Sequence, residues 1–171
     1  MVKPAARAST PKPASRELQR LDHQLCFALY SSSLLMTKLY KPVLAPLALT
    51  YPQYLVMLVL WEADAVQSGP RAAIGVGELG ERLYHDSGTL TPLLKRMQTA
   101  GLLQRARAAD DERRVIVTLT ATGRALRRRA EAVPLQVACA TGCKLAELAT
   151  LTVQLQALRS NVAGHLEPAA A

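Results

Sequence analysis

The segment from Gly77 to Arg105 constrains the fold more than any other part of the chain; it reads GELGERLYHDSGTLTPLLKRMQTAGLLQR. A short amphipathic pattern ends near Tyr84, and a second pattern starts at a helix N-cap on Asp86 or Ser87. Apolar residues in this second pattern recur at helical spacing, at Leu90, Leu93, Leu94 and Met97. Gly101 suits the position just after the helix, where a left-handed backbone is common. Two short helices with a tight turn between them predict a helix-turn-helix.

The polar face of the second helix has the chemistry of a DNA reader. Short hydroxyls lie near its N-terminus, where they suit base edges or phosphates, and cations follow, where they suit backbone phosphates. We therefore predict that this face contacts DNA through Ser87, Thr89, Thr91, Pro92, Lys95 and Arg96.

Two strand patterns follow the helix-turn-helix, at residues 102–106 and 115–119, and the turn between them reads RAADDERR. A helix-turn-helix followed directly by a β-hairpin is a winged helix. The hairpin tip carries Arg107, Arg113 and Arg114, which suit the narrow minor groove and its phosphates. Arg113 is the residue of this tip that we assign to DNA binding.

Two further helices are expected before this unit. A helical pattern begins with Ser15 and Glu17 and should stop near Tyr40, because Pro42 follows. A second helix should run from Tyr51 to about Ala63; it is apolar nearly all round and should therefore be central. A loop over 64–73 and a very short strand over 73–76 should lead into the helix-turn-helix.

After the hairpin, Thr120 should cap a helix that Pro134 bends rather than ends. The chain should turn near Gly142, and a last apolar stripe should reach about His165 through Leu145, Leu148, Leu151, Leu155, Leu158 and Val162. The first and the last helices carry more apolar surface than one small core needs. We therefore interpret them together as a dimerisation region.

These patterns predict a mainly α fold (α+β), a winged helix-turn-helix whose N- and C-terminal helices form the dimerisation region. We expect a disordered basic tail over 1–15 and a single domain over 16–171. Within that domain, the DNA-binding lobe should span about 51–120. The dimerisation helices should span about 16–45 and 121–166.

Composition supports a nucleic-acid partner. Lys and Arg number 21 against 13 Asp and Glu, which gives a net charge of +8 and favours a polyanion. No apolar run approaches the roughly 20 residues of a membrane span, and the N-terminus lacks the apolar core of a secretory signal. Three cysteines are too few and too far apart for a disulfide framework, so we expect a cytoplasmic protein with no membrane association.

Cys26 is the cysteine that looks least structural. A lone helical cysteine is most often a small buried hydrophobe. Here, however, the face that continues from Cys26 is rich in hydroxyls, at Tyr30, Ser33, Thr37 and Tyr40, and hydroxyl donors can hold a reactive thiolate. Tyr51 adds a hydroxyl at a helix start, and Cys139 and Cys143 offer partner thiols.

The spacing between Cys26 and Tyr40 bears on oligomeric state. If both residues lie on one helix, the rise between them is about 21 Å, so the two side chains cannot touch within one chain. A contact between them would require a second subunit.

Several longer motifs resemble a known family. They are LDHQLCFALY at 21–30, KLY at 38–40, LTYPQYLVMLVLW at 49–61 and DSGTLTPLLKR at 86–96, beside a wing with Asp111 and Arg113. Over roughly 21–166 the chain resembles the MarR-type winged-helix regulators, and within them the organic-hydroperoxide-sensing repressors. It departs from the pattern in a longer loop over 62–77 and in the first residues of the tail.

The resemblance implies roles for the cysteines and two tyrosines. Cys26 is implied to be the peroxide-reactive cysteine, oxidised first to sulfenic acid. Tyr40 and Tyr51 of the other subunit are implied to hydrogen-bond it. In the two-cysteine branch of this family, a cysteine near the end of the partner's fifth helix closes an intersubunit disulfide. Cys139 fits that position best, and Cys143, one helical turn further on, is the second choice.

The resulting hypothesis is a homodimeric repressor that binds a pseudo-palindromic DNA operator and releases it when an organic hydroperoxide oxidises Cys26. One alternative keeps the fold and replaces the signal with a reversibly bound phenolic or aromatic acid. Another is a thiol peroxidase, which the absence of a thioredoxin-like strand-helix alternation disfavours, so we expect no enzyme activity.

A metal-responsive regulator is the remaining alternative. His23, Cys26, His85, Cys139 and Cys143 are the residues on which it would depend, and no pair has convincing ligand spacing. We therefore expect neither a metal nor a cofactor. The arginine run 124–129 is interpreted as a solvated helix face rather than a phosphate-binding surface.

Overall fold

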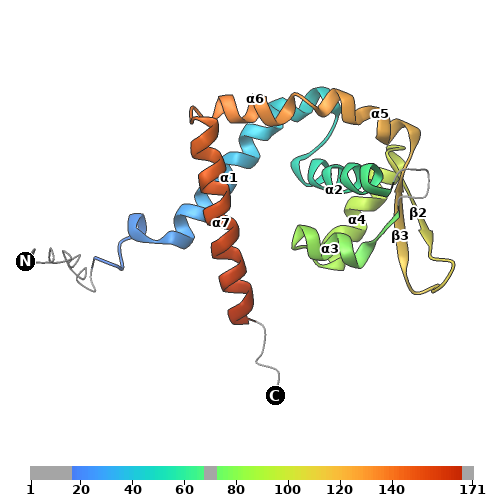
Figure 1. The fold of residues 1–171 in the computed structure, drawn as a ribbon, viewed down its shortest axis with the longest axis horizontal. Coiled ribbons are helices and arrows are strands. Elements are labelled where there is room, and N and C mark those ends of the chain that lie inside the picture. Colours follow the sequence, from blue (N-terminus) through green and yellow to red (C-terminus); the bar gives the residue numbers. More distant parts are fainter. Residues whose placement is uncertain (1–16, 68–72, 167–171) are drawn as a thin grey trace, which may run out of the picture. The chain divides into compact units, whose positions relative to one another are not determined.

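The computed structural model describes residues 17–67 and 73–166, so the predicted tail 1–15 lies outside the described residues (Figure 1). The chain divides into two compact units, with the boundary between Lys38 and Leu39. In chain order the helices are η1 (Leu21–His23), α1 (Leu25–Leu44), η2 (Ala45–Leu47), α2 (Tyr51–Gln67), α3 (Val76–Leu83), α4 (Ser87–Thr99), α5 (Ala121–Ala130), α6 (Val133–Ala140) and α7 (Leu145–Leu166). The strands are β1 (Ala73–Gly75), β2 (Leu103–Arg107) and β3 (Val115–Leu119).

Helix α1 differs from the sequence prediction at both ends. It starts at Leu25, after the short 3-10 helix η1, instead of near Ser15. It also continues through Pro42 to Leu44, although Pro42 removes one backbone hydrogen bond. Leu44 and Leu47 are buried, and their packing offsets that loss, which explains why the turn persists past the proline.

Helix α2 is the central helix that its apolar sequence predicts. Val56 and Met57 are fully buried, and Trp61 donates its indole N–H to the Gly123 carbonyl at 2.9 Å. At its N-terminus the Gln53 side chain accepts the Thr50 backbone N–H at 2.8 Å, the return half of a capping box.

The expected long loop over 62–77 is largely helical and extended structure instead. Helix α2 continues to Gln67, four residues beyond the predicted end, and β1 starts at Ala73. Two ion pairs hold this end of α2: Glu62 pairs with Arg82 of α3, and Asp64, in the extra turn, pairs with Arg124 of α5. Residues 68–72 lie outside the described part of the chain.

The sheet has three antiparallel strands in the order β1-β3-β2. The predicted hairpin pairs Leu103 with Leu119 and Arg107 with Val115. The short strand β1 pairs with the other edge of β3, with Ile74 opposite Val117, so the unit predicted as two-stranded has a third strand. Ile74, Val117 and Leu103 are almost fully buried and join the sheet to the core beneath α2 and α4.

Helices α3 and α4 form the predicted helix-turn-helix (Figure 1). Tyr84 ends α3 in a left-handed conformation with φ 54°. Asp86 is the N-cap of α4, and its side chain accepts the Thr89 backbone N–H. Gly101 follows α4 with φ 71°, in agreement with its predicted role. The apolar face of α4 is buried as its spacing predicts, through Leu90, Leu93, Leu94 and Met97.

The helix after the wing ends before Pro134, whereas the sequence predicted a bend at that proline. Thr120 caps α5 and accepts the Gly123 N–H at 3.0 Å, yet α5 stops at Ala130. Pro134 then lies in the first turn of α6. A proline lacks the N–H that a helix interior requires, while the first turn needs no such donor, so the chain restarts a helix there.

Helix α7 has no buried residue, and its exposed apolar side chains include Leu145, Leu151 and Val162. The turn before it contains Gly142 at φ 70°, as predicted. Across residues 17–67 and 73–166 no single helix has the length and hydropathy to cross a membrane, and only the bent pair Leu25–Leu47 and Tyr51–Val66 meets both criteria together.

Candidate nucleic-acid interface and cysteine sites

The exposed face of α4 starts from a well-made N-cap. Asp86 accepts the Thr89 backbone N–H at 2.8 Å through one carboxylate oxygen and the Thr89 hydroxyl at 3.1 Å through the other. These hydrogen bonds from Thr89 lower the pKa of Asp86. Because Asp86 keeps its charge, it satisfies backbone donors that would otherwise be open at the helix end.

All the residues predicted to read DNA on α4 are exposed: Ser87, Thr89, Thr91, Pro92, Lys95 and Arg96. Thr91 donates its hydroxyl to the Ser87 carbonyl at 2.7 Å, and Thr99 at the other end of the helix donates to the Lys95 carbonyl at 3.1 Å. The face therefore presents hydroxyls at its N-terminal half and cations in its C-terminal half. That these side chains contact DNA stays a prediction.

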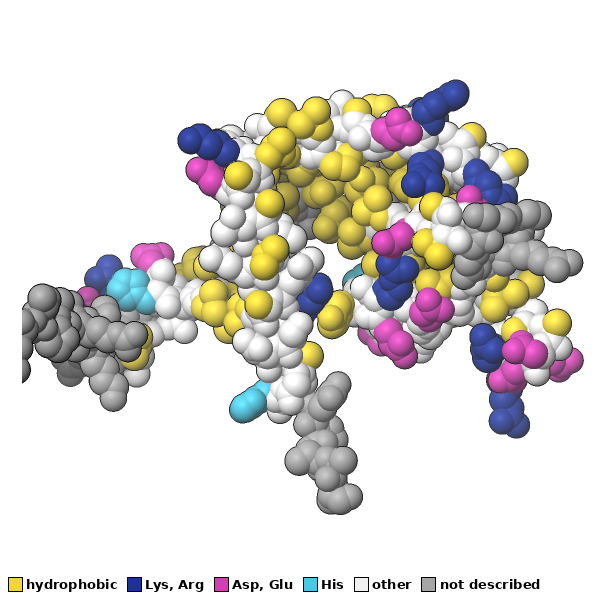
Figure 2. All heavy atoms as spheres, in the orientation of Figure 1, with side chains coloured by type: hydrophobic (Ala, Val, Ile, Leu, Met, Phe, Trp, Pro, Cys, Tyr) yellow, Lys and Arg dark blue, Asp and Glu magenta, His cyan; other side chains and the backbone are white. Residues whose placement is uncertain are grey.

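The tip of the β2–β3 hairpin carries both charges (Figure 2). Asp111 accepts the backbone N–H of Arg113 at 2.9 Å, which leaves the Arg113 side chain exposed at the tip. Arg114 pairs with Asp110 at 3.0 Å, and Arg107 donates to the Glu112 carbonyl at 3.3 Å. Arg113 is thus the arginine of the tip whose side chain forms no hydrogen bond or ion pair with the described residues.

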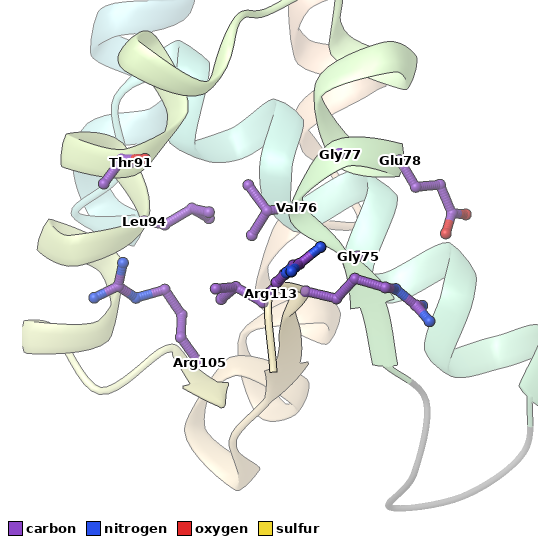
Figure 3. Close-up of a pocket in the computed structure, with 10 residues that line it drawn as sticks. Gly75, Val76, Gly77, Glu78, Thr91, Leu94, Arg105 and Arg113 are labelled. Carbon is purple, nitrogen blue, oxygen red and sulfur yellow. The ribbon is translucent and has the colours of Figure 1, made fainter. Parts of the chain in front are cut away.

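A cavity of about 460 Å³ lies between α4 and the wing (Figure 3). Thr91 and Leu94 of α4 border it, together with the start of α3 at Gly77 and with Arg113 of the wing. Arg105 of β2 also lines it, and Gln98 of α4 accepts the Arg105 Nε–H at 2.7 Å. The sequence prediction missed Arg105, although its place on the hairpin, opposite the reader helix, was a usable signal.

In a winged helix, the space between the reader helix and the wing can accommodate a DNA phosphate backbone. A reader helix occupies the major groove and a wing the adjacent minor groove, so the phosphate ridge between the grooves must pass between them. Arg105 and Arg113 border that passage, and Glu78 is the acidic side chain there. The arrangement suits a polyanionic backbone.

The arginines of α5 are mostly exposed, as predicted for a solvated helix face, with Arg124 half-buried, but three of them also form contacts within the chain. Arg124 forms its ion pair with Asp64 at 2.8 Å. Arg127 donates to the Trp61 carbonyl at 3.4 Å. Arg129 donates to the Pro46 carbonyl at 2.6 Å. Three of the four arginines therefore join α5 to α2 and η2, a structural role that their run in the sequence does not reveal.

Cys26 lies one residue after the start of α1, and its side chain is an exposed free thiol. The hydroxyl-rich face that follows it is only partly available as a donor, because Thr37 donates its hydroxyl to the Ser33 carbonyl at 2.9 Å. Helix α1 is continuous from Leu25 to Leu44, which satisfies the premise that Cys26 and Tyr40 share one helix.

Tyr40 and Tyr51 lie together, with ring centroids 4.4 Å apart, and Tyr54 is 6.0 Å from Tyr40. Burial raises the pKa of Tyr40 to about 12, with further contributions from Tyr51 and Tyr54, and burial also raises the pKa of Tyr51. Both phenols therefore stay protonated at neutral pH and keep their O–H groups as donors. The pairing of these two predicted site residues is a feature of the structure.

Cys139 and Cys143 are also exposed free thiols. Cys139 is the second-last residue of α6, close to a helix end as the resemblance implies. Cys143 lies beyond the helix, in the connection to α7, where its backbone N–H donates to the Thr141 hydroxyl at 3.2 Å. The expectation that Cys143 continues the helix of Cys139 is therefore wrong, because Gly142 in a left-handed conformation ends the helix between them.

A second cavity, of about 460 Å³, lies between α2 and the helices α5 and α6. Tyr54, Leu58 and Trp61 give it an aromatic and apolar wall, Arg127 contributes a cation, and Glu62 and Glu131 contribute carboxylates. Among residues 17–67 and 73–166, no three His, Cys, Asp or Glu side chains come close enough to hold a metal ion.

Comparison with known proteins shows similarity to transcriptional regulators. The model of the transcriptional regulator SarA/Rot family matches residues 38–129. The organic hydroperoxide resistance transcriptional regulator of Bacillus subtilis (strain 168) is 50% identical over 67% of this chain and 73% of its own length. The regulator TtmR of Methylorubrum extorquens (strain PA1) is 44% identical over 84% of this chain and 70% of its own.

Among solved structures, AbfR of Staphylococcus epidermidis is similar over nearly its whole length. Its reduced form bound to DNA is 32% identical, has a TM-score of 0.66, and matches over 87% of this chain and 99% of its own. AbfR has also been solved in an overoxidised form bound to DNA, with a TM-score of 0.65, and in a disulfide form, with a TM-score of 0.55.

Proposed function

Because the chain belongs to the SarA/Rot family of transcriptional regulators, with the winged-helix fold of MarR-type regulators, we propose that it is a DNA-binding repressor that senses organic hydroperoxides. In this proposal a homodimer binds a pseudo-palindromic operator when Cys26 is reduced and releases it when Cys26 is oxidised. The observation that carries the proposal is the exposed thiol of Cys26 in a chain 50% identical to an organic hydroperoxide resistance regulator.

DNA binding uses α4 and the wing. The N-terminal half of α4 enters the major groove with Ser87, Thr89 and Thr91, while Lys95 and Arg96 approach the phosphates. Arg113 enters the adjacent minor groove, whose narrow form attracts a guanidinium. Because phosphate contacts release counterions, binding weakens steeply as salt rises.

The sensing step is a thiol oxidation with a balanced outcome. The Cys26 thiolate attacks one oxygen of the hydroperoxide O–O bond, which breaks; the thiolate becomes a sulfenic acid and the organic group leaves as an alcohol. The thiolate of Cys139 of the partner subunit then attacks the sulfenic sulfur. A disulfide forms, and the sulfenic oxygen leaves as water. The hydroperoxide is the oxidant, and each cysteine pair consumes one equivalent.

Tyr40 and Tyr51 prepare the thiolate of the partner subunit's Cys26. Their raised pKa values keep both phenols protonated, so each donates a hydrogen bond to the thiolate. The chain's own Cys26 is about 21 Å away along α1, so the donors act across the dimer. Oxidation converts the Cys26 thiolate into a neutral sulfenic acid, so the hydrogen bonds from Tyr40 and Tyr51 to the anion are lost.

Cys139 is the proposed resolving cysteine, and Cys143 is the alternative. Cys139 closes a helix, so its thiol has a defined position, whereas Cys143 lies in a connection. Formation of a disulfide requires Cα atoms within about 7 Å, and in this proposal the two subunits shift to bring Cys26 and the partner's Cys139 to that distance. The shift changes the distance between the two α4 helices. Because the distance between successive major grooves is fixed, several protein–DNA contacts are then lost at once.

The dimer is supported by uncovered apolar surface. Helix α7 buries none of its side chains within one chain, and α1 exposes Leu25, Leu34 and Leu35. Exposed apolar patches of this kind mark interaction surfaces in soluble proteins. We assign both helices to a symmetric interface between two copies of this chain.

The proposal is tested by DNA binding of the reduced full-length protein to duplexes that it selects from a random pool. Wild type and Cys26→Ser are compared with and without cumene hydroperoxide, with Cys143→Ser as the matched cysteine control. Wild type and Cys143→Ser should lose binding with about one equivalent per subunit, and Cys26→Ser should keep it. Peroxide-sensitive binding by Cys26→Ser contradicts the proposal.

The cavity between α2, α5 and α6 favours one alternative function. Its aromatic wall suits an aromatic ring, and Arg127 would pair with the acid group, while Glu131 also lines the cavity and Glu62 is already paired with Arg82. A reversibly bound aromatic acid would then release DNA without oxidation. Salicylate titrated against the DNA complex in the absence of oxidant distinguishes the two. Release by salicylate that Arg127→Ala abolishes, with no response to peroxide, favours the alternative.

A further inference from the structure

The hydroxyl groups of Thr89 and Thr91 are both exposed on the reader face, and both have their protons engaged within the chain. The Thr89 hydroxyl donates to the Asp86 carboxylate at 3.1 Å. The Thr91 hydroxyl donates to the Ser87 carbonyl at 2.7 Å. A threonine hydroxyl has one proton and two lone pairs, so each of these groups has only lone pairs left to offer a partner.

Both protons have well-placed acceptors within the chain. Asp86 is anchored by the Thr89 backbone N–H at 2.8 Å, and a hydrogen bond to a carboxylate is roughly twice as strong as one between neutral groups. If Thr89 turned its proton outward, the carboxylate would lose one of its two donors while facing a polyanion. The Thr91 bond is short and lies in the regular position four residues back along the helix.

The major-groove edges of the bases differ in what they offer such a group. Adenine presents an amino donor at N6 and cytosine one at N4, whereas guanine presents only the acceptors N7 and O6, and thymine presents O4 and a methyl group. A hydroxyl that can only accept is satisfied by an amino group. Against a guanine O6 or a thymine O4, its lone pairs face other lone pairs.

We propose that Thr89 and Thr91 select operator bases that carry an exocyclic amino group in the major groove, adenine or cytosine, at two positions of each half-site. This inference rests on the proposed function, because it requires α4 to lie in the major groove. It adds the base chemistry that the two threonines recognise, and it leaves phosphate contacts to Lys95, Arg96 and Arg113.

The chain supplies a matched control on the same helix. Thr99 is exposed and donates its hydroxyl to the Lys95 carbonyl at 3.1 Å, the same internal bond as that of Thr91. It lies at the C-terminal end of α4, and reader helices of this type insert their N-terminal end into the groove. Thr99→Val therefore makes the same chemical change without a base within reach.

The test measures the affinity of the reduced full-length protein for its selected duplex and for every single-base variant of one half-site. Thr89→Val and Thr91→Val keep the shape and a methyl group but remove the acceptor. Each should lose a preference of roughly five- to tenfold for adenine or cytosine at one position, and the two positions should differ. Thr89→Ser, Thr91→Ser and Thr99→Val should keep the wild-type preferences.

Removal of the amino group from the DNA base, combined with the valine variants, gives a double-mutant cycle for each threonine. Purine replaces adenine, or 2-pyrimidinone replaces cytosine, at the position that each threonine reads. Wild type should bind the altered duplex roughly five- to tenfold more weakly, and the corresponding valine variant should bind both duplexes equally. The salt dependence of binding should be the same for wild type and both valine variants, because no phosphate contact changes.

Three results overturn the inference. A wild-type preference for guanine or thymine at the positions affected by Thr89→Val or Thr91→Val is the first. The second is a uniform loss of affinity across all sequences with a lower salt slope, which would show that the hydroxyls donate to phosphates. The third is an equal penalty for the altered duplex in wild type and variant. Failure of wild type to select any DNA would instead contradict the proposed function itself.

Discussion

Gly123 of α5 lies against Leu102 and Leu119 of the wing, and its carbonyl accepts the indole N–H of Trp61 in α2; Gly123→Ala should force α5 and the wing apart. A Cβ atom at this position would lie 2.0 Å from the Leu102 carbonyl oxygen and 3.1 Å from the Leu119 Cδ2 atom. The nearest of these contacts is with backbone, which cannot rotate away as a side chain does. To restore an ordinary contact of 3.4 Å, the two segments must separate by about 1.4 Å.

The magnitude follows from the hydrogen bonds at this point. Two bonds cross from the start of α5 to the segment that carries Leu102: the Thr120 hydroxyl donates to the Gly101 carbonyl at 2.6 Å, and the Thr120 backbone N–H donates to the Leu102 carbonyl at 3.2 Å. Both exceed hydrogen-bond length after such a separation. Each contributes about 1 kcal/mol, and the forced displacement adds about 1–3 kcal/mol, so the free energy of unfolding should fall by about 3–5 kcal/mol.

The assay is urea unfolding followed by fluorescence of Trp61, the single tryptophan of the chain, at one fixed protein concentration. Gly77→Ala is the matched control, because a Cβ there meets nothing within 4 Å. It should unfold within about 1 kcal/mol of wild type. If the midpoints of Gly123→Ala and Gly77→Ala coincide, the close approach of α5 to the wing is not rigid and the reasoning is refuted.

Three further predictions concern single side chains. The pKa of Asp86 is lowered in the folded state, so its charge stabilises the fold fully above the unfolded pKa near 4, and this stabilisation is lost as pH falls through the folded pKa. In urea unfolding, the difference in free energy of unfolding between wild type and Asp86→Ala should therefore be constant from pH 5 to 7 and should narrow in acid. Lys95→Ala and Arg113→Ala should each weaken binding to every DNA sequence and lower the salt slope by about one, measured by fluorescence anisotropy. Tyr40→Phe should leave the unfolding midpoint unchanged and slow the oxidation of Cys26 by cumene hydroperoxide, measured by thiol titration, because one donor to the thiolate is gone; an unchanged rate would exclude that donor role.

Local chemistry made the DNA-binding part of the fold predictable from sequence. Asp86 caps α4 and Gly101 follows it because each position demands a particular side chain or backbone conformation. The buried face of α4 followed from helical spacing in the same way. These features depend on neighbours within a few residues, which a sequence pattern records directly.

Long-range contacts accounted for most of the differences. The short strand predicted over 73–76 is confirmed as β1, but its pairing with β3, where Ile74 lies opposite Val117 far along the chain, was not predicted. The extra turn of α2 is held by Asp64 and Arg124, sixty residues apart. Pro134 was misjudged because its effect depends on where a helix restarts, which packing of Val133 and Val137 decides.

The candidate site was only partly accessible from sequence. The exposed position of the reader residues could be predicted from helical periodicity. The hydrogen bonds that the Thr89 and Thr91 hydroxyls donate within the chain depend on side-chain geometry, which a sequence pattern does not record. The proximity of Tyr40 to Tyr51 also depends on how α1 leads into α2, a feature that no short motif records. The roles of the cysteines stay predictions that depend on a second subunit.

The most direct test of the central claim measures DNA binding and intersubunit crosslinking in the same samples. Wild type, Cys139→Ser and Cys143→Ser are titrated with cumene hydroperoxide. Each sample is divided: one part is used to measure DNA binding by fluorescence anisotropy, and the other is run on a non-reducing gel. Peptide mass spectrometry then identifies the disulfide and any overoxidised Cys26. Wild type and Cys143→Ser should lose DNA in proportion to a Cys26–Cys139 linked dimer, and reductant should restore binding. Loss of DNA by Cys139→Ser to the same extent, or full DNA binding by the crosslinked wild-type dimer, would contradict the account.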